Sequence, residues 1–439
     1  MVSYASKLLV RTLGICRDAE IDEEVYTEVN LAKPEEQRFR SGIGLRVNID
    51  GKLGYAWSEG EMSEDEILTL AIKSASSGPS GSFSQKGFIS SPYTSTREEM
   101  NRQLEESINK MQSFVQELDF MLPSMLPKKR FSISARILQH TMKLTIRAGQ
   151  RSANRVLHLL SLNSRDDIPV GANIYSTSLN HSPSELLCLL AWRSILSEEI
   201  AWPENYILPV VFSNYACGSL LEDFAMDVLR INSACPPEAL QGLQWLSPEI
   251  TIKDNGTIPG GFGTVPFDGE GLNKVPVTII EDGRLSNRFY DLSAAKLNNL
   301  PPSCLAVRPW GAPPHPGYSN LSLKAGPYSI GDLCEKVGYG VFLDRLTPLP
   351  PHLKHKGEFA RRAETAFILK NGRPICRIPQ FIVRGKYEDI LGKDLIGLGR
   401  NQLLHGRTLT VPLAAKNLIF EEATIDSTEN WSDYPQLWW

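Results

Sequence analysis

Apolar and polar residues alternate in the segment GIGLRVNIDGKLGYAW, residues 42–57. Leu45, Val47 and Ile49 occupy every second position, which is the spacing of a strand with one buried face. The pair Asp50-Gly51 interrupts this alternation, and such a pair between two alternating runs is a strong hairpin signal. The segment therefore predicts two antiparallel strands joined by a tight turn.

Helical spacing, with an apolar residue every three or four positions, marks three other segments of the first half. These helices are predicted to begin after the capping residues Ser63, Thr96 and Ser182. The second helix should end at the prolines of MLPSMLPKKR, and the third near Glu199. Residues 75–95 are rich in Ser, Gly and Pro and predict a flexible loop, whereas residues 131–178 predict strands.

The second half is dominated by strand-turn-strand patterns. They are the segments TIKDNGTI, VPVTIIEDGRLSNRFY and TAFILKNGRPICRIPQFIV. Short helices are predicted at residues 218–230, 292–297 and 330–337. Successive hairpins indicate an antiparallel sheet or a partly closed barrel. We expect an α+β fold with two domains, residues 1–203 with a sheet and helices, and residues 204–439 with a barrel-like sheet and an acidic tail.

Composition narrows the class of protein. The chain has 439 residues, of which 42% are hydrophobic and 22% charged, as in ordinary globular proteins. A net charge of −4 argues against direct nucleic-acid binding. The sequence contains no apolar run of about 18 residues, so no membrane-spanning helix is predicted. The seven cysteines are scattered without a C-x-x-C pair, which favours a reducing, cytoplasmic location.

Three carboxylates lie within two turns of the predicted helix GSLLEDFAMDVLR: Glu222, Asp223 and Asp227. They could hold a hard cation or act as acid and base. The alternative, which the sequence favours, is a solvated helix face with Asp227 paired to Arg230. On a regular helix Glu222 and Asp227 point about 140° apart, so only a distorted helix would let them share one ion.

Two further segments are candidates for chemistry. Cys217 precedes Gly218 at the predicted start of the same helix, a position that can lower the pKa of a thiol. The glycine-rich segment 256–271 lacks the Lys-Ser/Thr pair of phosphate-binding loops. We predict a long loop with tight turns, of the kind that often lines a site. None of the histidines falls in a His-Glu-x-x-His motif.

Several of these segments together resemble the TldD/PmbA family, whose members are described as proposed modulators of DNA gyrase or as metalloproteases. The segment GIGLRVNIDGKLGYAW resembles its N-terminal signature, and PVVFSNYACGSLLEDF resembles its strand-then-helix segment. GTVPFDGEGLNKVPVTIIEDGRLSNRFYDLSAAKLN and FILKNGRPICRIPQFIVRGKYEDILGKDLIGLGRN follow in the family's order. The resemblance is strong in residues 42–57 and 205–400 and weak in residues 75–180.

The resemblance implies which branch of the family is involved. TldD-type chains carry His-Glu-x-x-x-His and a later cysteine, bind zinc, and are implicated in cleaving unfolded and leader peptides. Here Glu222 and Asp227 fall at the histidine positions and Asp223 at the glutamate, while NQLLHGRTLTVP, with His405, falls in the region of the cysteine. The resemblance implies a PmbA/TldE-like, non-catalytic subunit without its own metal, paired with a zinc-bearing TldD-like chain that acts on peptides.

This interpretation implies a chamber lined in part by the helix that carries Glu222 to Asp227. The loop residues expected to face the substrate are Gly260, Gly261, Gly263, Asp268 and Glu270. Two alternatives stay open. One is a stand-alone hydrolase that uses Glu222, Asp223 and Asp227 with a metal, or Cys217 as a thiol. The other is a non-enzymatic interaction protein of a toxin or topoisomerase pathway.

Overall fold

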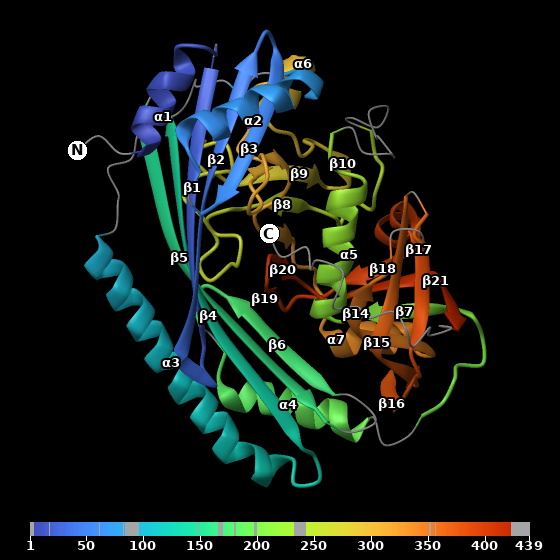
Figure 1. The fold of residues 1–439 in the computed structure, drawn as a ribbon. Coiled ribbons are helices and arrows are strands. Elements are labelled where there is room, and N and C mark those ends of the chain that lie inside the picture. The colour runs from blue at the N-terminus through green and yellow to red at the C-terminus, as the bar shows by residue number, and fades with distance from the viewer. Residues whose placement is uncertain are drawn as a thin grey trace.

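The computed structural model describes residues 4–16, 18–60, 62–81, 83, 96–147, 149–165, 170–179, 181–196, 200–231, 243–350, 353–355 and 357–422. An N-terminal sheet carries helices on one face, and its other face turns toward a second half with a mixed sheet and a closed barrel (Figure 1). The predicted α+β fold with a barrel in the C-terminal region is confirmed. Most of the predicted loop 75–95 and of the acidic tail lies outside the described residues. The predicted division after residue 203 lies between two elements, α4 and β7, and stays a prediction.

The N-terminal sheet is antiparallel, with six strands in the order β3-β2-β1-β4-β5-β6. Its strands are β1 (Asp18–Asn30), β2 (Lys33–Ile49), β3 (Lys52–Glu59), β4 (Phe131–Ile146), β5 (Gly149–Ser164) and β6 (Gly171–Ser176). The predicted β2–β3 hairpin is confirmed, with φ of 50° at Asp50 and 83° at Gly51, the positive values that its turn requires.

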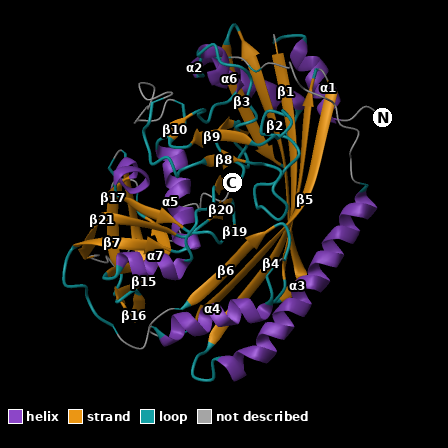
Figure 2. Ribbon diagram, turned by 180° about the vertical axis from the view of Figure 1, so that it is seen from behind, coloured by secondary structure: helices purple, strands orange, loops and turns teal. Residues whose placement is uncertain are grey.

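Four helices cover one face of this sheet (Figures 1 and 2). Helices α1 (Tyr4–Leu13) and α2 (Glu64–Ser77) pack near β1–β3, whereas α3 (Arg97–Met125) and α4 (Pro183–Ile195) pack near β4–β6. Odd-numbered residues of β1 supply the apolar contacts, with Ile21 buried under α1 and α2 and Val29 buried under α3 and α4. The three predicted capping residues of α2, α3 and α4 are confirmed, each within a complete capping box.

Helix α3 ends within the predicted stretch, at Met125 before Pro127, although it continues past Pro123. Pro123 and Asp119 are both exposed, so the one backbone hydrogen bond that proline removes is lost where water can replace it. Helix α4 ends at Ile195, four residues before the predicted end at Glu199.

The second half contains two larger sheets. One has the order β10-β9-β8-β13-β20-β19. The other closes into a five-stranded barrel, because its strands pair in the cycle β14, β7, β21, β17, β15 and back to β14. The bounds are β7 (Ile207–Phe212), β8 (Ile252–Asp254), β9 (Val277–Glu281), β10 (Arg284–Leu285), β11 (Ala306–Val307), β12 (His315–Pro316), β13 (Leu321–Leu323), β14 (Gly340–Pro348), β15 (Glu358–Lys370), β16 (Arg373–Arg377), β17 (Phe381–Lys386), β18 (Leu395–Leu398), β19 (Leu403–His405), β20 (Thr408–Thr410) and β21 (Leu413–Glu422).

The helices of this half are α5 (Asn214–Asp227), α6 (Leu292–Leu297) and α7 (Ile330–Val337), with a π-helical turn at Asp389–Lys393. The predicted helices 292–297 and 330–337 are confirmed, and so are the turns at Asp282-Gly283 and Asn371-Gly372. The predicted hairpin in TIKDNGTI is wrong. Neither Asn255 nor Gly256 has the positive φ of a tight hairpin turn, and the side chain of Asn255 instead accepts a hydrogen bond from the amide of Thr257.

The face of the N-terminal sheet that looks toward the second half is polar and buried. Glu20, Asp22 and Glu24 occupy alternate positions of β1 on this face and are each at most 2% exposed. The guanidinium of Arg308, which comes from the second half, donates to Asp22 at 2.9 Å and to Glu20, and its Nε donates to the carbonyl of Gly269. A second buried pair, Arg46 with Glu270 at 2.9 Å, joins β2 to the glycine-rich loop.

Glu24 has a different environment on the same face. Its Oε2 lies 2.8 Å from Nε2 of His140, whose ring stacks on Tyr26 with centroids 4.1 Å apart. Burial lowers the pKa of His140, and the charge of Arg155 adds to this effect, so the imidazole is neutral. Burial raises the pKa of Glu24 to about 7, against the opposing charges of Arg308 and Arg155.

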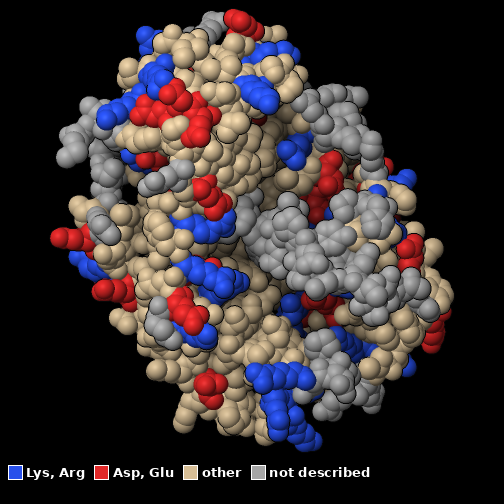
Figure 3. Space-filling view, viewed as in Figure 1, with Lys and Arg blue, Asp and Glu red and all other residues tan. Residues whose placement is uncertain are grey.

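Charged residues on the visible surface are mixed in sign. In Figure 3, lysine and arginine side chains are interspersed with aspartate and glutamate, without one dominant basic field on that face. In the part of the chain that the structure describes, no helix is both long and apolar enough to cross a membrane.

The first prediction concerns Arg308. Arg308→Met should lower the free energy of unfolding by about 3–5 kcal/mol, because two buried carboxylates lose their counter-charge. Denaturant unfolding measures this, with Arg373→Met at an exposed position as the control that should cost little. Adding Glu20→Gln and Asp22→Asn should recover part of the loss. No recovery would mean that Arg308 acts through packing rather than charge.

The second prediction concerns pH. A carboxyl group whose folded pKa is raised from 4.5 to about 7 contributes stability below pH 4.5 and loses it as the pH rises toward 7. Glu24→Gln removes this loss, so the variant should match the wild type near pH 4.5 and exceed it at pH 8 by at most roughly 3 kcal/mol. Urea unfolding across this range tests it. Glu28→Gln, on the same face of β1 but partly exposed, is the control for the loss of a carboxylate from this strand.

Candidate functional site

Helix α5 begins four residues before its predicted start. Strand β7 leads into it through Ser213, whose hydroxyl accepts a hydrogen bond from the amide of Ala216. Gly218, which was predicted to open the helix, lies inside it. A Cβ atom at Gly218 would be 2.7 Å from the hydroxyl of Thr408, so this glycine lets β20 approach the helix closely.

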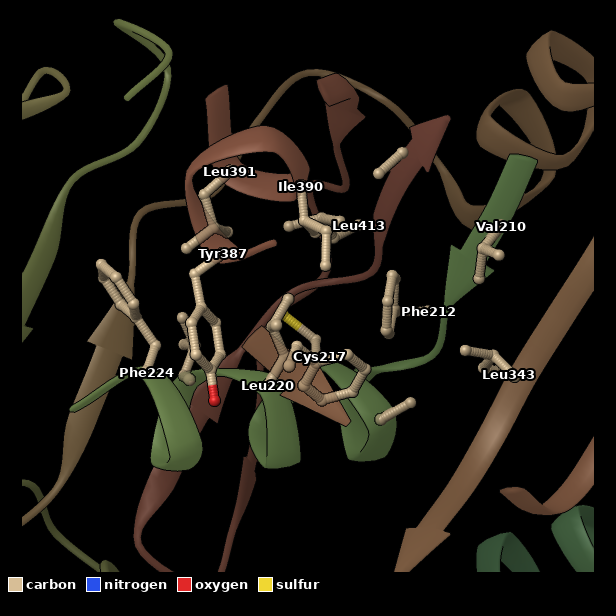
Figure 4. Close-up of a cluster of buried hydrophobic side chains, with 14 of the residues drawn as sticks. Val210, Phe212, Cys217, Leu220, Phe224, Leu343, Tyr387, Ile390, Leu391 and Leu413 are labelled. Carbon is tan, nitrogen blue, oxygen red and sulfur yellow. The ribbon is translucent and has the colours of Figure 1, made fainter. Parts of the chain in front are cut away.

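Cys217 faces the core of the barrel (Figure 4). Its sulfur lies among apolar side chains that include Phe212 and Leu220, and the residue is fully buried. Burial raises the pKa of Cys217 to about 12. The lowering of the pKa that a helix start can cause is absent, since desolvation dominates at a position inside the helix.

Asp223 is held by two cations. Its two oxygens accept hydrogen bonds from Nε and Nη2 of Arg361, both at 2.8 Å, and Nζ of Lys354 lies 3.3 Å from Oδ2. Asp223 is 8% exposed and Arg361 is 7% exposed. The prediction of a solvated helix face is wrong for this residue, because a bidentate buried pair replaces water.

Glu222 and Asp227 also have partners, on different sides of the helix. Glu222 is hydrogen-bonded to Tyr318; burial raises its pKa, and the charges of Arg361 and Arg407 oppose this. Asp227 accepts a hydrogen bond from the hydroxyl of Tyr387 at 2.9 Å. Among the described residues no ion pair joins Asp227 to Arg230, so the predicted pairing is absent. The three carboxylates do not converge on one point.

The donor set around α5 does not suit zinc. Zinc prefers nitrogen and sulfur ligands, whereas the helix offers carboxylates that already contact guanidinium, ammonium and phenol groups. Within the described ranges, no three His, Cys, Asp or Glu side chains are grouped so that they could hold a metal ion. His405 on β19 packs against the ring of Tyr215, with centroids 4.8 Å apart. Burial lowers the pKa of His405 to about 3, so it is neutral.

The glycine-rich loop packs closely against neighbouring segments of the chain. A Cβ atom at Gly261 would be 2.7 Å from the side chain of Asn320, and one at Gly263 would be 2.0 Å from the carbonyl of Ser319. The carbonyl of Gly260 accepts a hydrogen bond from the hydroxyl of Ser176, which ties the loop to β6. These glycines therefore allow close packing against neighbouring backbone.

The two acidic residues of the loop are buried as well. Asp268 accepts hydrogen bonds from the backbone amides of Glu270, Leu272 and Ala306, and Glu270 pairs with Arg46. Both side chains thus shape the loop. The prediction that the loop faces a substrate stays a prediction.

The α5 carboxylates and the loop lie on either side of one short segment, residues 318–320. Tyr318 contacts Glu222, while Asn320 accepts a hydrogen bond from the amide of Gly263 at 2.9 Å. Arg407 packs over the ring of Tyr318 and donates to the carbonyl of Ser319. The structure therefore joins the two predicted regions through intermediates rather than bringing them into contact.

Sequence reasoning missed four of the side chains that define this site: Tyr318, Arg361, Tyr387 and Arg407. One signal for Arg361 was present. In the run EFARRAETAFIL, Phe359, Arg361 and Ala363 alternate along one side of β15, and all three are buried. An arginine at an inward position of a strand indicates a buried acidic partner.

Comparison with solved structures gives the class of fold. The chain superposes on TldE from Thermococcus kodakarensis with a TM-score of 0.71 over 95% of this chain and 100% of the other, at 16% identity. At this identity the likeness shows a shared fold.

Sequence comparison gives the family. The model of the PmbA/TldA metallopeptidase C-terminal domain matches residues 204–425, just over half of the chain. The chain therefore belongs to the PmbA/TldD family.

Curated relatives match over shorter stretches. A protein of Methanocaldococcus jannaschii is 28% identical over 188 residues, covering 42% of this chain and 44% of the relative. A metalloprotease TldD homolog of Buchnera aphidicola is 24% identical over 153 residues, covering 35% of this chain and 32% of the relative. The chain spans less than half the length of either relative.

The third prediction separates the roles of the α5 carboxylates. Asp223→Leu should cost about 3–5 kcal/mol of unfolding free energy, because it leaves Arg361 buried without its bidentate partner. Asp227→Asn keeps an acceptor for Tyr387 and should cost about 1 kcal/mol or less. Denaturant unfolding of both variants tests the difference, and equal losses would contradict the assignment.

Proposed function

We propose that this chain is the non-catalytic, TldE-like subunit of a zinc peptidase assembly that acts on unfolded or leader peptides. The catalytic zinc belongs to a TldD-like partner chain, and this chain binds none. Its contribution is to complete the chamber in which the peptide is held.

The observation that carries this proposal is the bidentate pair of Asp223 with Arg361 on α5. TldD-type chains have a zinc motif at the corresponding place in the sequence, and here Asp223 falls at the position of its glutamate. The buried guanidinium neutralises this carboxylate and places positive charge near Glu222 and Asp227, which fall at the histidine positions of the motif. Helix α5 therefore carries an internal ion pair where the TldD-type motif has its glutamate.

The electrostatics of the neighbouring positions support the same interpretation. Burial raises the pKa of Glu222, and the positive charges of Arg361 and Arg407 oppose this rise. Burial likewise raises the pKa of Asp227, and the charges of Lys354 and Arg361 oppose it. A divalent cation brought to either carboxylate would meet two positive side chains. Repulsion of this kind is strong in a partly buried site, where water screens charge less than in bulk solution.

The alternative of a stand-alone hydrolase has less support. A thiol nucleophile must be deprotonated and accessible, but Cys217 is fully buried and its pKa is raised. A metal-dependent mechanism would require Asp223 to leave its pair with Arg361. Neither change is favoured by the contacts around α5.

The fourth prediction tests the proposed role by native mass spectrometry in the presence of zinc. The chain alone should carry no stoichiometric metal, and it should form a defined complex with a TldD-type chain from the same genome. The mixture, unlike either chain alone, should cleave an unfolded peptide. A chain that binds one zinc ion by itself and ignores the TldD-type chain would contradict the proposal.

A matched pair of variants locates the chamber. Glu222→Gln changes the charge of the half-buried face of α5, and Glu358→Gln changes an equal charge on the barrel strand β15. If α5 faces the chamber, the first should change the cleavage rate of the assembled complex and the second should not. Unchanged proteolysis with both variants would show that α5 does not face the chamber.

A further inference from the structure

The outer edge of strand β2, opposite β1, is open only along the first half of the strand. Strand β1 pairs with β2 along nearly its whole length, from Lys33 to Asn48. Strand β3 pairs with β2 only from Gly42 to Ile49. In the described structure no strand pairs with the outer edge of residues 36–41. Alternate residues there direct their N–H and C=O groups away from β1, as in any antiparallel ladder.

A hollow of mixed polarity adjoins this edge on the helix-covered face. The hollow has a volume of about 270 Å³ and is bounded by β1, β2, β4 and the first turns of α3. Its apolar lining comes from Val25, Phe39, Met100 and Leu104, and its polar lining from Thr27, Gln37, Asn101, Gln139 and Thr141. Phe39 is 67% exposed, which is unusual for a large aromatic side chain inside a strand. The hollow can accept an aliphatic side chain next to the open edge.

The opposite face of the same segment is basic. Arg38 and Arg40 lie on this face of β2, and Arg136 of β4 lies two strands away. Arg136 pairs with Glu28 at 3.1 Å and Arg40 pairs with Glu59 at 2.6 Å. Glu36 of the same segment pairs with Lys33 at 2.8 Å. Arg38 has no ion-pair partner among the described side chains.

We propose that residues 36–41 of β2 bind an extended segment of another protein as an added strand, and that this segment alternates aliphatic and acidic side chains. The backbone edge supplies hydrogen bonds, the hollow beside Phe39 takes the aliphatic side chains, and Arg38 pairs with the acidic ones. This inference does not rest on the proposed peptidase role, because binding requires neither zinc nor a second subunit.

A second copy of this chain fits the edge less well. If two copies paired through this segment about Phe39 in antiparallel orientation, Arg38 of one copy would lie opposite Arg40 of the other. Like charges directly opposite each other destabilise a strand pair. A partner strand with carboxylates at alternate positions removes this repulsion and replaces it with attraction.

Fluorescence anisotropy at low ionic strength tests the proposal with labelled synthetic peptides of about nine residues. A peptide of alternating valine and glutamate should bind the full-length chain, and a peptide of alternating valine and lysine should not. Backbone N-methylation of one alternate set of residues should abolish binding, while methylation of the other set should be tolerated, because only one edge of an added strand faces β2. Equal binding of all these peptides would overturn the proposal, and so would absence of binding.

Variants with matched controls locate the site. Arg38→Glu and Phe39→Ser should each weaken binding on the order of tenfold or more. Arg373→Glu and Phe120→Ser make the same changes at exposed positions on β16 and α3 and should have no effect. Equal effects of the variants and their controls would overturn the assignment. Sedimentation of the chain alone addresses self-pairing: a dimer that Phe39→Ser dissociates would assign the edge to a second copy instead.

Discussion

The structure depends on how buried carboxylates on the polar face of the N-terminal sheet are neutralised. Glu20 and Asp22 are kept from water by the second half of the chain, and that half supplies the guanidinium of Arg308. Removing ions from water is costly, so such a pair is stable only when its geometry is nearly complete. In the pair of Arg46 with Glu270, the N-terminal sheet supplies the cation and the second half supplies the carboxylate. Each half therefore buries charges that only the other half can balance, which fixes how the sheet and the glycine-rich loop pack.

The same principle governs helix α5. A helix that follows a barrel strand and faces the interior of the molecule is a suitable scaffold for a metal site, but here cations supplied by the protein occupy its carboxylates. Arg361 and Lys354 satisfy Asp223, and a phenol satisfies Asp227. The acidic side chains of this helix therefore serve internal pairing, which is the basis for the non-catalytic role proposed above.

The sequence predicted what local chemistry determines and missed what distant contacts determine. Capping boxes and tight turns are local, and those at Ser63, Thr96 and Asn371-Gly372 were found correctly. Strand β1 was not predicted; its carboxylates Glu20, Asp22 and Glu24 resemble a solvated face, but they are buried against the second half. The prediction for the α5 carboxylates was wrong for the same reason. The acidic residues of α5 resemble a solvated face until Arg361, 138 positions later in the chain, is placed against Asp223.

Strands β1 and β2 combine two kinds of surface along their length. Toward Glu20 and Arg46 the polar face is sealed by the second half, and a substitution there acts on stability. Toward Arg38 and Phe39 the strands extend past β3, and their charges meet solvent. Charge on an edge strand opposes unwanted pairing between copies. The same charge favours a partner of opposite sign, so one feature both opposes pairing between copies and sets the specificity of the proposed strand addition.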